Sequence, residues 1–524
     1  MTSEVKELVD GVLHRATAEV GLDVEYVRAR GNTVFARGRD GTGVPVADFL
    51  GGYGALLLGH NHPDLVAHLA NLLAQETPVL VQLSSQPAAD EVVRTLNRVL
   101  HREFDVDEPY FGVFANSGAE GIEVALKHAE FDRGQRVDAM RAEIDENIGA
   151  ALSAGLAGAT VDGSVLGLPV GSAVDEVVEE IRVRNAAAFA TGPRLIALSG
   201  GFHGKLVGSG QLTHNHDYRS PFASLAAQAT FAPANEPEAL RAVFEDARVT
   251  AYDLRITETR AEVVRRDAPV FCALLVEPVQ GEGGIVPLTA EFAKQVQELG
   301  AEFGCPVVVD EIQSGTGRTG TFFASAQLGL LGDYYVLSKS IGGGLAKLSV
   351  TLVRAARYRP EFEMVHSSTF AKDGLSTSVA AAVLELLEAG DGALYRVAAE
   401  RGRRLSAALH EVRAEYPEII TDVRGLGLLQ GVEFGDLSTS GSTLAAQLQA
   451  QGQFGFLASG FLLHEHRIRL FPTGSAPNTL RLEPSVQVTD EEIDRLATGL
   501  RALCALLRAG DDQGLTAFIA KREF

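Results

Sequence analysis

The chain has 524 residues, 46% of them hydrophobic and 22% charged, and a formal net charge of −22. This length predicts two domains or one large α/β domain with a smaller companion. The acidic balance argues against a nucleic acid or an anionic membrane as partner, since either requires a basic surface. The sequence has no apolar run of 18 residues and no signal-like N-terminus, which predicts a cytoplasmic protein.

Three scattered cysteines, Cys272, Cys305 and Cys504, are too few for a disulfide framework or a metal site. All three stand among apolar residues, and we expect them to be buried packing residues.

The N-terminal part predicts a helix followed by strands. Residues 4–19 place apolar side chains near helical spacing, and residues 24–49 predict β-structure interrupted by a glycine-rich turn at 38–43. Glycines then frame the next turns. His60 and His62 stand two positions apart there, but no third ligand is near, so a glycine-framed turn explains them better than a metal site.

A turn of small residues at 116–123 has the character of a helix N-terminus. Ser117 and Glu120 have the spacing of a capping box, and apolar residues continue at helical spacing to Ala129. The unpaired N–H groups and positive dipole end of such a turn form a phosphate site. Most capping boxes only cap a helix, so the turn gains chemical meaning only with the motifs that follow.

Residues 130–193 have the pattern of an insertion. Residues 133–151 predict a polar helix, and residues 152–171 are rich in Gly, Ala and Ser. A second helix is predicted next, with Ser172 and Asp175 at cap spacing. The segment therefore predicts a helical hairpin joined by a mobile loop. The sequence leaves open whether it only elaborates the surface or also shapes the active-site mouth or a subunit contact.

Two strand-like runs lead into glycine-rich loops. The first loop carries Phe202, and an isolated phenylalanine is more often a core residue, whereas packing explains the second loop poorly. Residues 195–198 lead into Gly200-Gly201-Phe202-His203-Gly204, where an aromatic side chain at a strand end can stack on a planar cofactor. Residues 273–276 lead into a glycine-rich loop that carries Glu277 and Glu282. Two acids at the carboxyl end of a strand indicate a binding site.

The chain is organised around two stretches, 307–313 and 336–344. The first is a β-branched run ending in Asp310, typical of a buried parallel strand, and the second is an apolar run followed by Lys339 and three glycines. Either feature alone is ordinary. Ligands bind at the carboxyl edge of open α/β sheets, and a desolvated lysine is a nucleophile. Of the eight lysines, only Lys339 directly follows such a run. A lysine that holds an aldehyde, with a carboxylate that keeps a ring nitrogen protonated, suits pyridoxal phosphate.

The C-terminal part predicts a smaller α+β lobe. Helices are expected over most of 376–416, strands around 418–434 and 480–488, and a helix over 491–507.

Together these motifs resemble the class III (omega-type) aminotransferases, fold-type I pyridoxal phosphate enzymes. The resemblance runs in order from Asp48 to about Leu507, with 130–193 as the main interruption. It implies an α/β fold: a large domain on a mostly parallel seven-stranded sheet, and a smaller α+β domain built from both termini. The expected boundaries are 1–75 and 376–524 for the small domain and 76–375 for the large one, with 130–193 as a helical insertion.

The resemblance also implies a role for each motif residue around the cofactor. Lys339 holds the aldehyde and then moves protons, and Asp310 pairs with the pyridinium nitrogen. Ile312 packs under the ring, Phe202 stacks on its other face, and Gln313 approaches the phenolic oxygen. Further cofactor-binding residues are Ser117, Gly118 and Ala119 at the phosphate, together with His203 and Glu277.

On the substrate side the resemblance implies that Arg481 binds an α-carboxylate. Glu282 is expected to pair with this arginine when the substrate has no carboxylate there, and Tyr53 to border the pocket. Thr369 resembles a threonine that reaches the phosphate from the partner subunit, which implies a homodimer with shared active sites.

The implied function is transfer of an amino group from an amino acid to an aldehyde or ketone by a ping-pong mechanism. An aminomutase, decarboxylase or lyase on the same fold is the alternative, because the cofactor performs the organic chemistry in all of them. A non-catalytic module is disfavoured, since it has no need of Lys339. Donor, acceptor and pathway stay open, with natural-product biosynthesis and the catabolism of a diamine or ω-amino acid both compatible.

Overall fold

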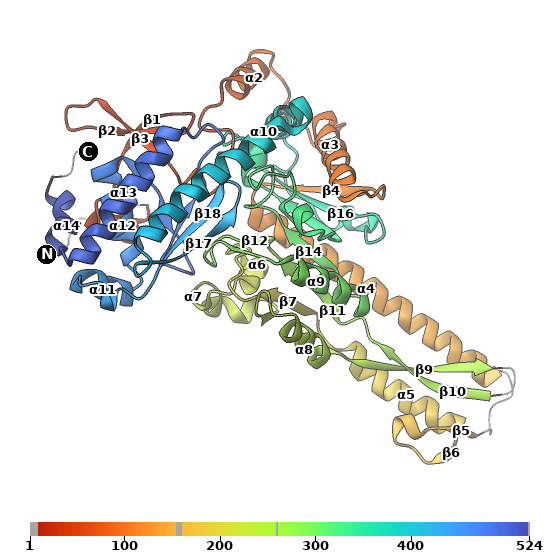
Figure 1. Ribbon diagram of the computed structural model, residues 1–524. Coiled ribbons are helices and arrows are strands. Elements are labelled where there is room, and N and C mark those ends of the chain that lie inside the picture. The colour runs from red at the N-terminus through yellow and green to blue at the C-terminus, as the bar shows by residue number, and fades with distance from the viewer. Residues whose placement is uncertain (1–8, 154–159, 258–259, 522–523) are drawn as a thin grey trace, which may run out of the picture.

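The computed structural model describes residues 9–153, 160–257, 260–521 and 524. Its centre is a seven-stranded sheet in the order β4-β16-β15-β14-β11-β7-β8 (Figure 1). All strand pairs from β15 to β8 are parallel, whereas β16 lies antiparallel to β15 and to β4. The predicted mostly parallel seven-stranded sheet is confirmed. Its strands are β4 (Tyr110–Ala115), β7 (Arg194–Leu198), β8 (Ala229–Ala232), β11 (Phe271–Val276), β14 (Val307–Asp310), β15 (Tyr334–Leu337) and β16 (Ser349–Arg354).

Helices cover both faces of this sheet, which is why its central strands are continuous apolar runs. Alternate side chains point to opposite faces: Val308 packs against Ile122 and Ala125 of α4 (Gly118–Ala151), and Val309 packs on the other side with Phe292 of α9. That second face is covered by α3 (Pro87–Phe104), α8 (Pro237–Ala247), α9 (Ala290–Glu302) and the first half of α10 (Gly374–Glu415). The three cysteines are buried and free, as expected.

Segments from both ends of the chain build a smaller α+β domain beside the large one. A first sheet joins β1 (Tyr26–Arg30), β2 (Thr33–Arg37) and β3 (Gly43–Asp48) to β19 (Ile468–Arg469). A second holds β17 (Ile420–Leu426), β18 (Leu429–Phe434), β21 (Thr479–Leu482) and β20 (Phe471–Pro472). The helices here are α1 (Gly11–Glu19), α11 (Thr443–Ala450), α12 (Phe454–His466), α13 (Asp490–Ala509) and α14 (Asp512–Lys521).

The two domains are connected through α10, whose ends contact helices of each. Residues 389–392 break its helical backbone, so it consists of two helical stretches, as the sequence predicts. For the helix expected over 4–19, the structure has α1 from Gly11 to Glu19, and residues 4–8 of that prediction lie outside the described part. A helix at α2 (Pro63–Ala74) follows the N-terminal strands.

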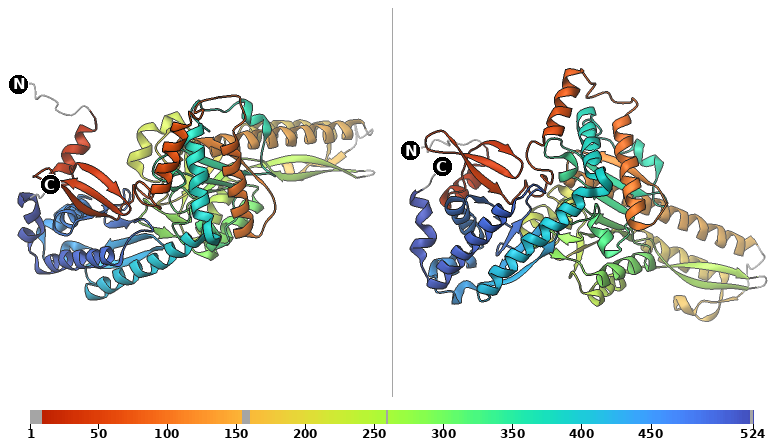
Figure 2. Two further views of the ribbon diagram at one scale, coloured as in Figure 1. Left: turned by 90° about the horizontal axis from the view of Figure 1, so that it is seen from above. Right: turned by 45° about the horizontal axis from the view of Figure 1, so that its top comes forward.

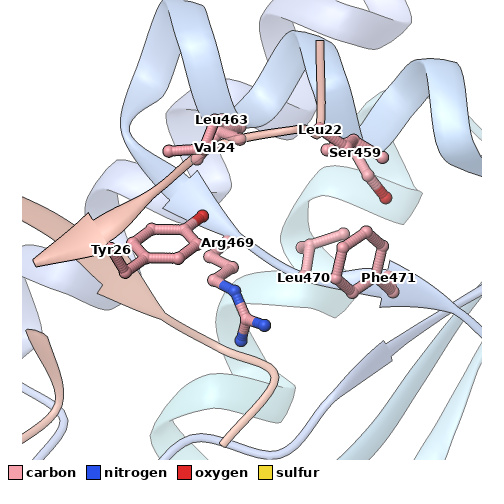
Figure 3. Close-up of a pocket in the computed structure, with 8 residues that line it drawn as sticks. All are labelled: Leu22, Val24, Tyr26, Ser459, Leu463, Arg469, Leu470 and Phe471. Atoms are coloured by element: carbon pink, nitrogen blue, oxygen red, sulfur yellow. The ribbon is translucent and has the colours of Figure 1, made fainter. Parts of the chain in front are cut away.

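A small pocket shows how the N-terminal segment packs on the C-terminal one (Figure 3). Tyr26 on β1 faces Arg469, whose guanidinium lies 5.4 Å from the centre of the tyrosine ring. Burial raises the pKa of Tyr26 to about 12, although the Arg469 charge opposes this. Arg469 also donates to Asp48 at 3.0 Å, and Asp48 bonds to His60 at 2.8 Å. His60 therefore has a structural partner within the turn.

An arm projects from the large domain, away from the small one (Figures 1 and 2). It contains the second half of α4, α5 (Val174–Phe189), the short strands β5 (Thr160–Asp162) and β6 (Val170–Ala173), and the hairpin of β9 (Thr250–Thr257) and β10 (Arg260–Asp267). Its apolar side chains form a core of their own, centred on Ile144, Val177, Ile181 and Leu254.

The two helices expected over 130–193 are present as the second half of α4 and as α5, but the structure differs from the predicted hairpin in four respects. The helix does not begin near Arg133, because α4 is continuous from Gly118, so the first half of this helix belongs to the sheet and the second to the arm. The connection contains β5 and β6, and residues 154–159 of the expected mobile loop lie outside the described part. The arm also includes the β9–β10 hairpin from a later part of the chain. The cap spacing predicted Ser172 as the N-cap of the second helix. The N-cap of α5 is instead Ala173, which makes no side-chain cap hydrogen bond.

Short elements carry the loops at the carboxyl edge of the large sheet. These are α6 (Val207–Leu212) and α7 (His216–Arg219) after β7, and β12 (Val279–Gln280) paired with β13 (Val286–Pro287) after β11. Among the described helices, none has the length and apolar character needed to cross a membrane.

Candidate active site

The motif residues converge at one edge of the large sheet. Asp310 ends β14, and Lys339 follows β15, the parallel neighbour in which Val336 pairs with Asp310. The Phe202 turn follows β7, and the loop of Glu277 and Glu282 follows β11, so four adjacent parallel strands deliver their loops to one place. Since β16 is antiparallel to both β15 and β4, the end of β4 and the turn after it also reach this edge. Ligands of open α/β sheets bind at this edge.

Lys339 is held in a strained and desolvated position. Its φ of 50° lies in the left-handed region, which costs energy for a residue with a side chain and occurs preferentially at functional sites. The next residue, Ser340, donates to the carbonyl of Gly54 at 2.5 Å and so fixes the loop to the N-terminal segment. Burial lowers the pKa of Lys339; Glu483, Glu282 and Asp310 oppose this effect. A lowered pKa favours the nucleophilic amine.

Asp310 and His203 form a buried pair. The Oδ2 atom of Asp310 lies 2.8 Å from Nδ1 of His203, and its Oδ1 accepts the backbone N–H of Ile312 at 3.0 Å. Burial would lower the pKa of His203, but the hydrogen bond and charge of Asp310 outweigh it and raise the pKa. The other ring nitrogen, Nε2, is buried and has no hydrogen-bond partner in the described structure.

Glu277 ties two of the loops together. Its carboxylate accepts the backbone N–H of Phe202 at 2.9 Å and that of Gly281 at 3.2 Å. Burial raises the pKa of Glu277 to about 7, while the charge of His203 lowers this pKa and that of Asp310 raises it. The carboxyl group therefore fixes the Phe202 turn against the Glu282 loop.

The predicted phosphate turn lies against the predicted ring-binding residues. Ser117 caps α4, accepting the N–H of Glu120 at 3.3 Å. A Cβ on Gly118 would lie 2.8 Å from Cδ1 of Ile312, and one on Gly204 would lie 2.6 Å from the Cβ of Ala119. Only glycine allows this proximity, so the Phe202–Gly204 turn, Ile312 and the start of α4 meet.

These neighbours fit pyridoxal phosphate. A helix N-terminus with free N–H groups suits the phosphate, and Phe202 and Ile312 are partly exposed apolar side chains next to it. Asp310, acceptor-only and backed by His203, suits a protonated ring nitrogen. Lys339 supplies the amine. Together these groups match the phosphate, the ring and the aldehyde of one pyridoxal phosphate molecule.

The predicted substrate residues also lie together. Arg481 is 1% exposed and pairs with Glu282, whose second oxygen accepts the N–H of Gly474 at 2.6 Å. Tyr53 places its ring 4.7 Å from the guanidinium carbon. Burial would raise the pKa of Glu282 and lower that of Arg481, but their mutual attraction reverses both shifts. Arg481 and Glu282 thus form a closed ion pair.

The sequence analysis missed two residues of this region. Tyr218 on α7 lies edge-on to Phe202, with ring centres 6.3 Å apart, and burial together with the nearby Glu282 charge raises its pKa. Glu483 is completely buried and accepts from Nε2 of Gln313 at 2.8 Å. Strand alternation could have found Glu483, since it stands two positions after Arg481, whereas nothing local marks Tyr218.

Thr369 lies on an exposed loop at the rim of the site. Its carbonyl accepts from Gln82 at 3.1 Å, and the preceding Ser368 accepts from Asn116 of the same chain at 3.1 Å. The loop therefore lies beside the residue that precedes the Ser117 turn. The hydrogen bond between Gln82 and Thr369 joins two segments that expose apolar side chains, namely Leu80, Val81, Leu83, Met364, Val365 and Phe370.

Several solved structures that this chain resembles are aminotransferases. Ornithine aminotransferase from Toxoplasma gondii is 21% identical with a TM-score of 0.65, covering 94% of this chain and 91% of that one. An amine transaminase from an uncultivated Pseudomonas species, solved in its PLP-bound form, is 20% identical with a TM-score of 0.66, covering 92% and 94%. Ornithine δ-aminotransferase from Plasmodium falciparum is 20% identical with a TM-score of 0.61, covering 94% of each chain. At these identities the likeness establishes the fold.

The family follows from the sequence itself. The family model for class III aminotransferases matches residues 15–503, nearly the whole chain and all of the motifs described above. The chain therefore belongs to the class III aminotransferases and is a pyridoxal-phosphate-dependent enzyme.

Proposed function

We propose that the enzyme moves an amino group from an amino acid with an α-carboxylate to an aldehyde or ketone by a ping-pong mechanism. The observation that carries this proposal is the closed pair of Arg481 and Glu282 at the same sheet edge as Lys339. A bidentate guanidinium suits an α-carboxylate. With Glu282 as partner, the arginine avoids being left unpaired when an uncharged substrate occupies the site. Two unlike substrates can then use one pocket in turn.

Pyridoxal phosphate, when bound, supplies an electron sink that stabilises negative charge at the substrate Cα. Lys339 takes the proton from that carbon, as its lowered pKa favours. Asp310 keeps a proton on the ring nitrogen, and His203 orients Asp310. Ser117, Gly118 and Ala119 hold the phosphate, Phe202 and Ile312 enclose the ring, Gln313 lies near its phenolic oxygen, and Glu277 fixes the surrounding loops.

We also propose that the enzyme acts as a homodimer in which Thr369 completes the partner's phosphate site. The exposed apolar residues around its loop support a covered surface, because patches of this kind mark interaction sites.

The test is the absorbance spectrum of the purified enzyme with bound cofactor, before and after addition of L-glutamate, L-alanine or L-glutamine. We expect a visible band that converts to a near-ultraviolet band with one of these donors, and an equivalent of keto product. A carbonyl acceptor should then restore the visible band. A band that no donor converts would contradict transamination and favour the aminomutase or lyase alternative.

The role of Arg481 has a separate test. The R481A variant should keep the visible band but lose most of its activity with the carboxylate donor, because a charge-assisted bidentate contact is lost. Full activity of R481A with glutamate or alanine would show that another residue binds the carboxylate.

A further inference from the structure

Glu483 is a buried carboxylate to which the proposed reaction gives no role. It is 0% exposed and follows Arg481 by two positions, so the two side chains lie on the same face at the end of β21. Its backbone N–H donates to the carbonyl of Phe49 at 2.7 Å. Glu483 is thus fixed where the C-terminal strand meets the N-terminal segment.

The two carboxylate oxygens of Glu483 have different surroundings. Oε1 accepts the hydrogen bond from Gln313. Oε2 lies 3.4 Å from Nε of Arg481, yet neither of these two buried atoms makes a hydrogen bond within the described structure. The charges therefore attract each other without the bond that would lock them together.

Arg481 accordingly lies between two carboxylates that are held very differently. Glu282 stands between Gly281 and Gly283 on the turn that joins β12 to β13, and its side chain is 16% exposed. Glu483 is enclosed and bonded to Gln313. A substrate carboxylate can replace Glu282, whereas Glu483 stays in place.

Two other cations lie within the field of Glu483. Burial lowers the pKa of Lys339, and the charge of Glu483 is the largest influence that acts against this lowering. It likewise opposes the lowering of the pKa of Arg318 by burial. Arg318 donates to the carbonyls of Leu428, Pro484 and Gly54 and, among the described residues, forms no ion pair with a carboxylate. Removing the Glu483 charge would leave this part of the site more positive.

Building on the proposed transamination, we propose that Glu483 is a specificity-determining residue. It keeps Arg481 partly neutralised after Glu282 moves aside, and so weakens the binding of a carboxylate relative to an uncharged group at the same position. The substrate class that gains is amines, aldehydes and ketones that carry no carboxylate next to Arg481. Glu282 lets Arg481 exchange between this glutamate and a substrate carboxylate. Glu483 sets how strongly the pocket prefers an uncharged substrate group over a carboxylate.

The test uses the cofactor-loaded enzyme and two unreactive ligands of equal shape, propanoate and propanamide. Calorimetry measures their dissociation constants with the wild type and with Glu483→Gln, which keeps the side-chain size and the acceptor for Gln313. We expect propanoate to bind about tenfold more tightly to the variant, since a nearby charge shifts an ionic equilibrium by roughly one to three powers of ten. Propanamide should change less than twofold.

Glu311→Gln is the matched control. Glu311 is an equally buried carboxylate bonded to Ser314 and Ser325, and its pKa is raised to about 7 by burial. This variant should bind both ligands like the wild type. Melting temperatures check folding, and Glu483→Ala, which should shift propanoate binding in the same direction, serves if Glu483→Gln does not fold.

Arg481→Gln separates the two ways of failing. If it weakens propanoate binding while both Glu483 variants leave that binding unchanged, the role of Glu483 is overturned and that of Arg481 stands. If Arg481→Gln leaves propanoate binding unchanged, the carboxylate-binding role of Arg481 fails, and the inference fails with it.

Discussion

Two buried aspartates, Asp310 at the sheet edge and Asp253 in the arm, are each 4% exposed but have unlike surroundings. Asp253 accepts from Asn147 at 3.1 Å, from the backbone of Leu254 at 2.8 Å and from Arg266 at 3.0 Å. Its charge is neutralised and its oxygens are bonded within the arm itself. That is how a buried charge serves stability.

The sheet edge leaves part of its bonding capacity unused. The buried Nε2 of His203, Nε of Arg481 and Oε2 of Glu483 have no hydrogen-bond partner in the described structure, and Lys339 combines a strained backbone with a lowered pKa. Leaving such groups unpaired is costly. The comparison teaches that the buried Asp253 of the arm finds its hydrogen-bond partners within the arm. The sheet edge instead keeps buried polar groups whose partners must come from a bound cofactor or substrate.

The largest expected effect comes from Lys339→Ala. The variant should lose the visible cofactor band and about four powers of ten in kcat/KM, because it removes the amine that holds the aldehyde and moves the proton. Lys347→Ala, a change of the same type at an exposed lysine, is the control and should leave both unchanged. Residual turnover of Lys339→Ala within tenfold of wild type would remove Lys339 from the mechanism.

Asparagine substitutions at the two aspartates test the comparison directly. Asp310→Asn should lower kcat/KM by about three powers of ten, the upper range for losing one preorganised electrostatic group. Asp253→Asn should leave kcat/KM within twofold and instead lower the free energy of unfolding by about 1–3 kcal/mol, because the Arg266 charge stays behind. Steady-state kinetics give kcat/KM for both variants, and urea unfolding gives their free energies of unfolding. A large activity loss in Asp253→Asn would connect the arm to the reaction.

Thr369→Ala should weaken the binding of the cofactor about tenfold, because one hydrogen bond to a charged group is lost. Co-expression with Lys339→Ala tells which subunit uses the threonine. If Thr369 acts across the interface, the mixed dimer has one complete site, so its activity should approach half that of wild type. If Thr369 acts within its own chain, beside Asn116, the mixed dimer should be no more active than Thr369→Ala alone.

The smallest effect concerns the pH dependence of stability. The pKa of Glu277 is about 7 in the folded protein, above its ordinary value of 4.5. The folded state therefore holds this proton more tightly, so the stabilisation is present at low pH and is lost as pH rises towards 7. Between pH 5 and 7 the free energy of unfolding of the wild type, minus that of Glu277→Gln, should fall by about 1.4 kcal/mol per pH unit. Parallel profiles from urea titrations would contradict the raised pKa.

Much of the fold was predictable because its signals are local. The β-branched run 307–309 indicates a buried strand wherever it occurs, and the Ser117–Glu120 spacing indicates a helix start. The arm was predicted less well. Its β9–β10 hairpin does alternate apolar and polar residues, as at Tyr252 and Leu254, but the pattern does not tell that the hairpin packs on α4 and α5.

By itself the sequence determined the family, the strand-like runs that carry the motifs, and Lys339 and Asp310 as the residues to test. These depend on short patterns whose physical meaning does not change with context. Only the tertiary structure revealed Glu483 beside Gln313, 170 positions away. The pair of Arg481 and Glu282, 199 positions apart, was expected from the family resemblance, but the complete burial of Arg481 between two carboxylates was not. Whether a buried charge is paired, and therefore whether it stabilises the chain or acts on a ligand, depends on neighbours that only the folded chain brings together.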